Sequence, residues 1–161
     1  MTGPRIALVG AGSMGRNHAR VIAESPAAEL ALIVDAREDT ARSVADTYGA
    51  AWSADLDGLS GIDAVVVAAS TEHHFSIAQE ALRAGLPVLV EKPLCPSLAQ
   101  TLEILRISEL AGVPIMCGFL ERYNPAVMVA RKMIGRPLYA RAERHSPYAP
   151  RMTTGVAWDL L

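Results

Sequence analysis

A glycine-rich hexapeptide, Gly10-Ala11-Gly12-Ser13-Met14-Gly15, directly follows the apolar run at residues 6–9. This placement predicts a tight turn from a strand into a helix. The first glycine bends the chain, and the third lets the helix pack closely on the strand. The second leaves the backbone open to a pyrophosphate, which the N–H groups at the helix N-terminus then bind. The chain is thereby constrained to a parallel α/β sheet built around a phosphate-binding turn.

An acidic residue stands where a bound dinucleotide needs one. Asp35 closes a second apolar run at 30–34 and lies twenty positions after Gly15. A carboxylate at the end of the second strand hydrogen-bonds the adenosine ribose 2′-hydroxyl. Arg37 suits a 2′-phosphate, but Asp35 repels one, so NAD is favoured over NADP. The alternative is a turn that binds no ligand, which the position of Asp35 disfavours. The cofactor-binding residues expected here are Gly10, Gly12, Ser13, Met14, Gly15, Asp35 and Arg37.

Short apolar runs alternate along the chain with longer segments of helical spacing. Runs such as 64–68 are apolar without alternation, which is typical of parallel strands covered by helices on both faces. The pattern predicts a doubly wound α/β fold of the Rossmann type over residues 1–120, with its ligand at the carboxyl ends of the strands. The expected strands are 5–9, 30–34, 50–52, 63–68, 87–90 and 114–118, and the expected helices are 13–24, 38–48, 72–84, 97–111 and 125–134.

Composition places the chain among globular proteins. Apolar residues make up 51% of it, yet no apolar run approaches the roughly 20 residues of a membrane span. Cys95 and Cys117 lack the spacing of a metal site or disulfide scaffold and are expected to be buried thiols in a reducing, cytoplasmic compartment. Residues 131–151 carry six basic groups against one acidic, which suits a solvated segment or a surface for an anionic substrate. The chain has no long basic stripe with interleaved aromatic residues, which disfavours nucleic acid.

Polar residues follow the strand expected at 63–68. The hydroxyls of Ser70 and Thr71 suit a cofactor ribose or phosphate, and capping of the next helix is the favoured alternative. His73 and His74 are adjacent, so on a helix they diverge by about 100° and make no metal pair. No metal site is expected. His18, on the first helix, is assigned to packing or to solvent.

Glu91-Lys92-Pro93 follows the strand expected at 87–90. Lys92 is one of two lysines, beside thirteen arginines. A lysine can lose its proton when partly desolvated, whereas an arginine effectively cannot. Lys92 is therefore a candidate to relay a proton to or from a substrate hydroxyl during hydride transfer. The alternative is a surface lysine paired with Glu91. Pro93 is compatible with a cis peptide bond.

The character of the chain changes after Gly118. Asn124 is a plausible N-cap and Pro125 suits the first position of a helix. Residues 138–145 alternate like a strand, and the region 121–161 is expected to be a connecting helix and the truncated start of a second, α+β domain. A strand without a neighbour and the apolar side chain of Trp158 favour contacts between copies of the chain through residues after 121, so a homo-oligomer is expected.

Together these motifs resemble the Gfo/Idh/MocA family of NAD(P)-dependent sugar oxidoreductases. Glu91-Lys92-Pro93 after a Gly-x-x-Val-Leu-Val strand is the most specific part, and the stretches after residue 120 look most like the family's UDP-N-acetylglucosamine 3-dehydrogenase branch. Other carrying segments are Gly10-Ala-Gly-Ser-Met-Gly15, Asn17-His18, Asp35, Thr71-Glu-His-His74, Gly118-Phe-Leu-Glu-Arg-Tyr-Asn-Pro-Ala-Val127, Pro147-Tyr-Ala-Pro-Arg151 and Thr154-Gly-Val-Ala-Trp-Asp-Leu160.

The resemblance implies roles for particular residues. Lys92 falls on the family's active-site lysine, before a cis proline, and Asp159 falls on the acid of its Asp-x-x-x-His motif. Ser70 stands where the family usually has proline, and the chain ends two residues after Asp159, before the motif histidine. The further cofactor residues implied are Ser70, Thr71, His74, Glu91 and Lys92, and the substrate-binding residues implied are Arg122, Tyr123 and Asn124.

The function expected is that of an NAD-binding domain. It would serve an oxidoreductase that oxidises or reduces a sugar or nucleotide-sugar hydroxyl, and it would be inactive alone, because relatives of this family are roughly twice this length. One alternative is a stand-alone NAD-binding or redox-sensing module without catalysis. Another is an assembly subunit completed by a partner chain.

Overall fold

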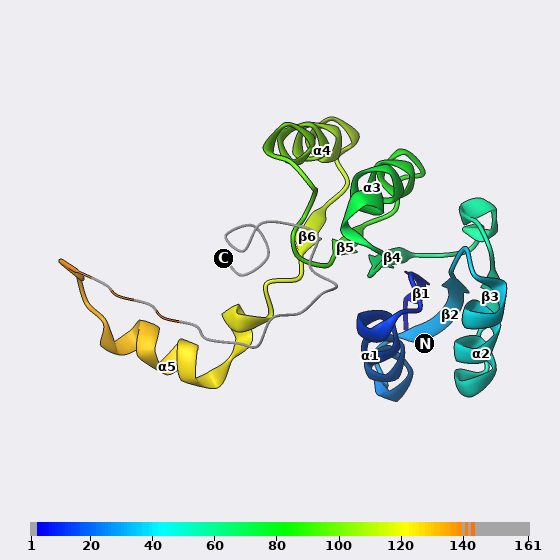
Figure 1. The fold of residues 1–161 in the computed structure, drawn as a ribbon, viewed down its shortest axis with the longest axis horizontal. Coiled ribbons are helices and arrows are strands. Elements are labelled where there is room, and N and C mark those ends of the chain that lie inside the picture. Colours follow the sequence, from blue (N-terminus) through cyan, green and yellow to red (C-terminus); the bar gives the residue numbers. More distant parts are fainter. Residues whose placement is uncertain (1–2, 140, 142, 144–161) are drawn as a thin grey trace. The chain divides into compact units, whose positions relative to one another are not determined.

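The computed structural model describes residues 3–139, 141 and 143, and the chain divides into two units, Met1–Gly118 and Phe119–Leu161. The first unit contains one parallel sheet of six strands in the order β3-β2-β1-β4-β5-β6 (Figure 1). This order confirms the doubly wound Rossmann fold expected from the sequence. The strands are β1 (Arg5–Val9), β2 (Glu29–Val34), β3 (Ala51–Ser53), β4 (Ala64–Val67), β5 (Val88–Val90) and β6 (Ile115–Cys117).

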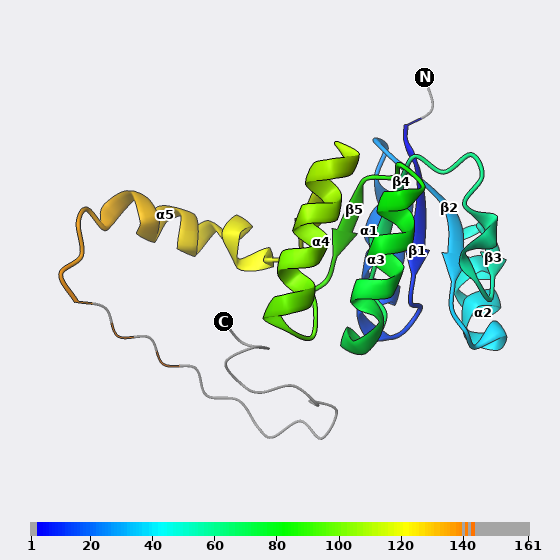
Figure 2. The ribbon, with the colours of Figure 1, turned by 90° about the horizontal axis from the view of Figure 1, so that it is seen from above.

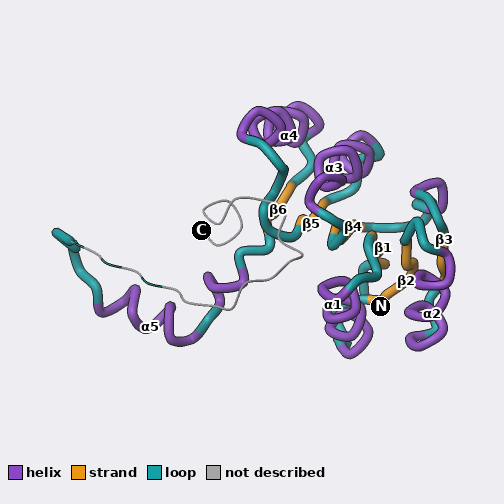
Figure 3. The backbone as a smooth tube through the Cα atoms, viewed as in Figure 1, coloured by secondary structure: helices purple, strands orange, loops and turns teal. Residues whose placement is uncertain are grey.

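Helices alternate with the strands along the chain, as Figure 3 shows by colour. Helices α1 and α2 cover one face of the sheet, and α3 and α4 cover the other (Figures 1 and 2). The helix expected at 72–84 is a short 3₁₀ turn, Thr71–His73, followed by α3. None of the helices in the described ranges is both long and apolar enough to cross a bilayer. The helices are α1 (Ser13–Glu24), α2 (Glu38–Tyr48), α3 (His74–Arg83), α4 (Leu98–Ala111) and α5 (Pro125–Met133).

The uniformly apolar strands are explained by two cores, one on each face of the sheet. Successive side chains of a strand point to opposite faces. Ala7 and Val9 of β1 therefore pack with residues of α3 and α4, including Leu82 and Ile104. Leu8, between them, packs with α1 and α2 on the other face. Because both faces are covered by helices, apolar residues at every strand position are buried.

The strand order places the site at the carboxyl ends of the central strands. Val9, the last residue of β1, pairs with Val34 of β2 on one side and with Val67 of β4 on the other. The chain runs from β1 outward to β3 and then crosses back to β4, so the connections after β1 and β4 diverge. A crevice at such a switch point is where open α/β sheets bind their ligands.

In the second unit, α5 begins as the sequence predicts. The side chain of Asn124 accepts a hydrogen bond from the Ala126 N–H at 3.0 Å, and Pro125 occupies the first turn. The strand expected over 138–145 is wrong at its four described residues, which adopt no strand. An alternating pattern becomes a strand only beside a hydrogen-bonded neighbour, and none pairs with these four residues. The other residues of 138–145 lie outside the described residues, as do Trp158 and Asp159. The expected homo-oligomer stays a prediction.

Candidate functional site

The glycine turn needs its first and third glycines for the fold itself. Gly10 adopts a φ of 95°, in the left-handed region that favours glycine. A Cβ atom at Gly10 would overlap the backbone of Ala69, and one at Gly15 would overlap the carbonyl oxygen of Gly10. The turn after β1 therefore touches the end of β4, and helix α1 begins directly against the turn.

The second glycine has a different environment. A Cβ atom at Gly12 would meet no protein atom within 4 Å. Gly12 is also the N-cap residue of α1, and no side chain caps the helix there. The first N–H groups of a helix have no intrahelical partners and carry a partial positive charge. The fold therefore leaves an open space beside these N–H groups that a side chain at position 12 would fill.

Asp35 lies beside the glycine turn, at the end of β2. Its Oδ2 accepts a hydrogen bond from the Ala11 N–H at 2.8 Å, and its Oδ1 accepts one from the Arg37 N–H at 3.0 Å. The guanidinium Nε of Arg37 lies 3.5 Å from the same Oδ1. The backbone thus fixes the carboxylate next to the turn, as the spacing predicted, while most of the Arg37 side chain is exposed.

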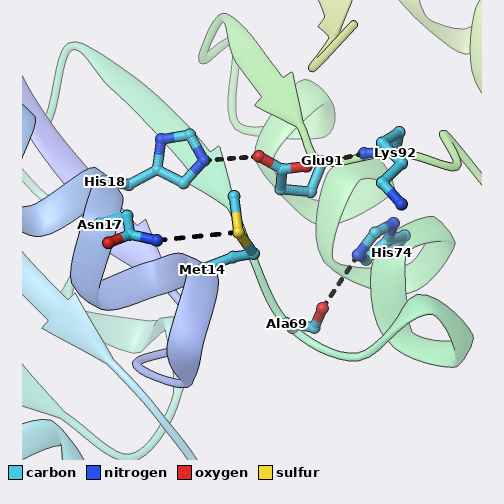
Figure 4. Close-up of polar contacts among 7 residues, drawn as sticks. All are labelled: Met14, Asn17, His18, Ala69, His74, Glu91 and Lys92. Atoms are coloured by element: carbon cyan, nitrogen blue, oxygen red, sulfur yellow. Dashed lines mark hydrogen bonds and ion pairs between the residues drawn. The ribbon is translucent and has the colours of Figure 1, made fainter. Parts of the chain in front are cut away.

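At the end of β5, the carboxylate of Glu91 is buried and reaches back to α1 (Figure 4). Its Oε1 lies 2.7 Å from Nε2 of His18, and its Oε2 accepts a hydrogen bond from the Lys92 N–H at 3.1 Å. Burial raises the pKa of this carboxyl, but the bonds to His18 and to the Lys92 N–H, with the charges of both residues, outweigh it, so the pKa is lowered. Glu91 is therefore buried while Lys92 is exposed, and the alternative of a surface lysine paired with Glu91 stays a prediction.

Lys92 itself is exposed, between buried Glu91 and buried Pro93. The Lys92–Pro93 peptide bond is cis, as the resemblance implied. The ring of His74, at the start of α3, lies beneath this segment and is 1% exposed. Its Nδ1 lies 2.8 Å from the carbonyl oxygen of Pro93, and its Nε2 lies 3.0 Å from that of Ala69.

These contacts change the expected role of His74. A histidine that binds the cofactor directly needs a ring nitrogen directed at the cofactor, and both nitrogens here face backbone carbonyl groups. Ser70 is exposed, and it precedes the turn Thr71–His73 without a side-chain cap. The capping alternative for Ser70 is therefore not supported. Both Ser70 and the partly exposed Thr71 follow β4, at the same edge as the glycine turn.

Three expected site residues belong to the second unit. Arg122 and Tyr123 are exposed in the 3₁₀ turn Leu120–Tyr123, where the Arg122 guanidinium stacks on the Phe119 ring at 5.2 Å. Asn124 caps α5 with its side chain. Within the described ranges, no three His, Cys, Asp or Glu residues form a group that could hold a metal ion.

The residue that sequence reasoning missed is His18. Its partner is 73 positions away, and nothing in the local pattern of α1 distinguishes it from a packed or solvated histidine. The available signal was indirect: Glu91 is a carboxylate directly after a buried strand, and such a group needs a polar partner. Only the tertiary structure, which brings the His18 ring of α1 to the residue that follows β5, identifies that partner.

Comparison with known proteins agrees with this geometry. Residues 4–119 match the family model described as oxidoreductase family, NAD-binding Rossmann fold. The chain is 29% identical over 160 residues to UDP-N-acetylglucosamine 3-dehydrogenase of Acidithiobacillus ferrooxidans, covering 98% of this chain and 50% of that protein. It is 32% identical over 160 residues to inositol 2-dehydrogenase of Leifsonia xyli subsp. xyli, covering 93% of this chain and 47% of that protein.

Solved structures also match this chain. The structure of the Acidithiobacillus ferrooxidans enzyme GnnA matches with a TM-score of 0.90 and 29% identity, over 99% of this chain and 53% of that one. GenD2 from gentamicin A biosynthesis, solved in complex with NAD, matches with a TM-score of 0.70 and 32% identity, over 73% of this chain and 35% of that one. The chain spans about half the length of the curated relatives it matches first.

Proposed function

This chain belongs to the Gfo/Idh/MocA oxidoreductase family, and we propose that its residues 1–118 hold NAD for an enzyme that oxidises or reduces a sugar or nucleotide-sugar hydroxyl. The observation that carries this proposal is the contrast among the three glycines. Packing against backbone accounts for Gly10 and Gly15, but no protein atom accounts for Gly12. A ligand bound beside the N-terminus of α1 explains why position 12 carries no side chain.

The residues at this edge fit a dinucleotide. The N–H groups of Ser13, Met14 and Gly15 begin α1 and suit the negative charge of a diphosphate. Asp35 is held beside the turn with its carboxylate partly exposed, which suits an adenosine ribose hydroxyl. The charge of Asp35 repels a 2′-phosphate, so NAD is proposed over NADP, although Arg37 stands nearby.

We assign the proton transfer to Lys92. When bound, NAD supplies the hydride acceptor or donor. Oxidation of a hydroxyl also releases a proton, and reduction of a ketone consumes one. The Lys92 amine, exposed at the carboxyl end of β5, takes up or returns that proton at the substrate oxygen. Ser70 and Thr71 at the end of β4 are proposed as cofactor contacts on the neighbouring strand.

The substrate is proposed at the level of its class. The two relatives compared above are named for a nucleotide sugar and for inositol, both of which carry a polyhydroxylated ring. A UDP-sugar is the more specific proposal, because it is anionic and residues 131–151 are basic. Arg122, Tyr123 and Asn124 are proposed as its further contacts. Asp159 is proposed as a catalytic residue together with Lys92, as the family resemblance implies. The chain alone is expected to show no turnover, since its relatives have about twice its length.

The test is a titration of the 161-residue chain with NADH, followed by cofactor fluorescence, and a parallel titration with NADPH. Gly12→Val places a side chain in the open space and is expected to weaken NADH binding by more than about tenfold, as the loss of a few backbone hydrogen bonds implies. Gly135→Val is the matched control, because a Cβ at Gly135 also meets no atom within 4 Å. Absence of NADH binding, or equal binding by both variants, would contradict the proposal.

A further inference from the structure

Two buried side chains, Glu91 and His74, bond the backbone of the dipeptide Lys92–Pro93. Among the described residues, the charged or polar side chains that are buried are His74 and Glu91, with 1% and 6% exposure. Both hydrogen-bond the backbone of Lys92–Pro93. We propose that Glu91 and His74 form a clamp that fixes the backbone from which the exposed side chain of Lys92 extends. They are positioning residues, and the benefit to catalysis rests on the function proposed above for Lys92.

The Glu91 half of the clamp anchors Lys92 to helix α1. One carboxylate oxygen accepts from the Lys92 N–H, and the other bonds His18. The carboxylate lies close to Gly118, where an added Cβ atom would contact its Cδ and its Oε1, both at 3.4 Å. Lys92 is therefore tied through Glu91 and His18 to helix α1 (Figure 4). Gly12 is the N-cap residue of the same helix.

The His74 half anchors the other end of the dipeptide. Nδ1 lies 2.8 Å from the Pro93 carbonyl oxygen, while Nε2 lies 3.0 Å from the Ala69 carbonyl oxygen. Ala69 follows β4 and Pro93 follows β5, so the ring bridges the exits of two adjacent strands. A neutral imidazole donates a hydrogen bond from only one nitrogen. Substitutions that keep a donor near the place of Nδ1 alone, or near the place of Nε2 alone, therefore test the contacts with Pro93 and Ala69 one at a time.

The clamp explains why polar groups are buried at this place. A buried polar side chain costs stability unless it is hydrogen-bonded, and a buried charge costs more. Glu91 accepts a hydrogen bond from the Lys92 N–H and bonds His18. Each ring nitrogen of His74 lies within hydrogen-bond distance of a carbonyl oxygen, and the neutral ring donates to one of the two. A hydrophobic residue at either position would fill space but would leave the Lys92–Pro93 backbone with fewer constraints.

The chain offers a direct readout, because Lys92 and Lys132 are its two lysines. Labelling with [¹³C,¹⁵N]lysine gives two backbone amide signals and two side-chain Cε signals, and Lys132, in the second unit, is the internal reference. Glu91→Gln keeps an acceptor oxygen but removes its charge, so it is expected to speed hydrogen exchange at the Lys92 amide about tenfold, because a hydrogen bond to a charged acceptor is stronger than one to a neutral amide oxygen. It is also expected to shift the Lys92 Cε signal, and Lys132 should not change.

His74 is tested by a pair of variants. His74→Asn keeps an N–H donor near the place of Nδ1 and is expected to leave the Lys92 signals close to those of the unmodified chain. His74→Gln keeps a donor near the place of Nε2 only and is expected to perturb them as Glu91→Gln does. His73→Asn and His73→Gln, at the exposed neighbour, are the controls and should change neither lysine.

Unchanged Lys92 signals in Glu91→Gln and His74→Gln would overturn the clamp. Equal perturbation by His74→Asn and His74→Gln would overturn the assignment to Nδ1. If a His74 variant fails to fold by circular dichroism, the isosteric Glu91→Gln decides the outcome. NADH titration of the same samples separates the clamp from the proposed cofactor binding. If the lysine signals change as described but NADH does not bind, the clamp is supported and the proposed function is contradicted. If NADH binds but the lysine signals do not change as described, the clamp is contradicted.

Discussion

His18 Nε2 lies 2.7 Å from Glu91 Oε1, joining helix α1 to the end of β5 across 73 positions of sequence. The His18 side chain is 17% exposed and that of Glu91 is 7% exposed, so water competes little for this bond. A hydrogen bond that includes a charged group is stronger than a neutral one, and more so away from solvent. The contact therefore couples the helix at the glycine turn to the segment that carries Lys92.

The stability contributed by Glu91 should depend on pH. Its pKa is lower in the folded chain than the ordinary value, so the stabilisation is present above the unfolded pKa and is lost as pH falls through the folded one. The difference in free energy of unfolding between the chain and Glu91→Gln should be about 1–3 kcal/mol near neutral pH. It should shrink below about pH 4, where carboxyl groups protonate.

Urea unfolding at a series of pH values measures this difference. Glu80→Gln, at an exposed position of α3, is the control and should show no comparable pH dependence. A difference for Glu91→Gln that grows toward acid pH would contradict the sign of the pKa shift.

The glycines of the turn should separate into two classes by stability. Gly15→Ala places a Cβ against the Gly10 carbonyl oxygen, so the turn or α1 must shift, and a loss of about 1–3 kcal/mol is expected. Gly12→Ala meets no protein atom and should leave stability within about 0.5 kcal/mol. Thermal unfolding of the two variants without cofactor checks the contrast, and equal melting temperatures would refute it.

Asp35 should govern the choice of cofactor. Asp35→Asn removes the charge and keeps an oxygen that can accept the Ala11 N–H. NADH affinity is expected to fall by about 1–2 kcal/mol, the value of hydrogen bonds to a charged group. NADPH affinity should rise relative to NADH, because the repulsion of a 2′-phosphate is removed and Arg37 stays in place. Calorimetric titration with both cofactors measures the ratio, and an unchanged ratio counts against the assignment.

The two thiols should differ in reactivity. Burial raises the pKa of the Cys95 thiol to about 11, whereas Cys117 is partly exposed. Because the thiolate is the reactive form, alkylation near pH 8 should modify Cys95 more than about tenfold more slowly than Cys117. Mass spectrometry of peptides after timed iodoacetamide treatment gives both rates. The rates should become similar in concentrated guanidinium; similar rates in the folded chain would show that Cys95 is accessible.

Local patterns were sufficient for much of the fold. Apolar runs and helical spacing predicted the strands and helices of residues 1–118 to within one or two residues for most elements, because each is set by its own periodicity. The same reasoning failed for a strand over 138–145. There the alternation was present, but the described residues have no neighbouring strand to pair with.

Within the site, the sequence by itself determined the positions whose role is local. Gly10 and Gly15 are required by the geometry of one turn, Gly12 occupies its place in the same motif, and Asp35 follows at the spacing of one strand–helix–strand unit. Only the tertiary structure decided that Glu91 bonds His18 and that His74 bridges two strand exits. Hydrogen-bond partners that are far apart in sequence are selected by how the helices pack on the sheet, and no local spacing records that packing.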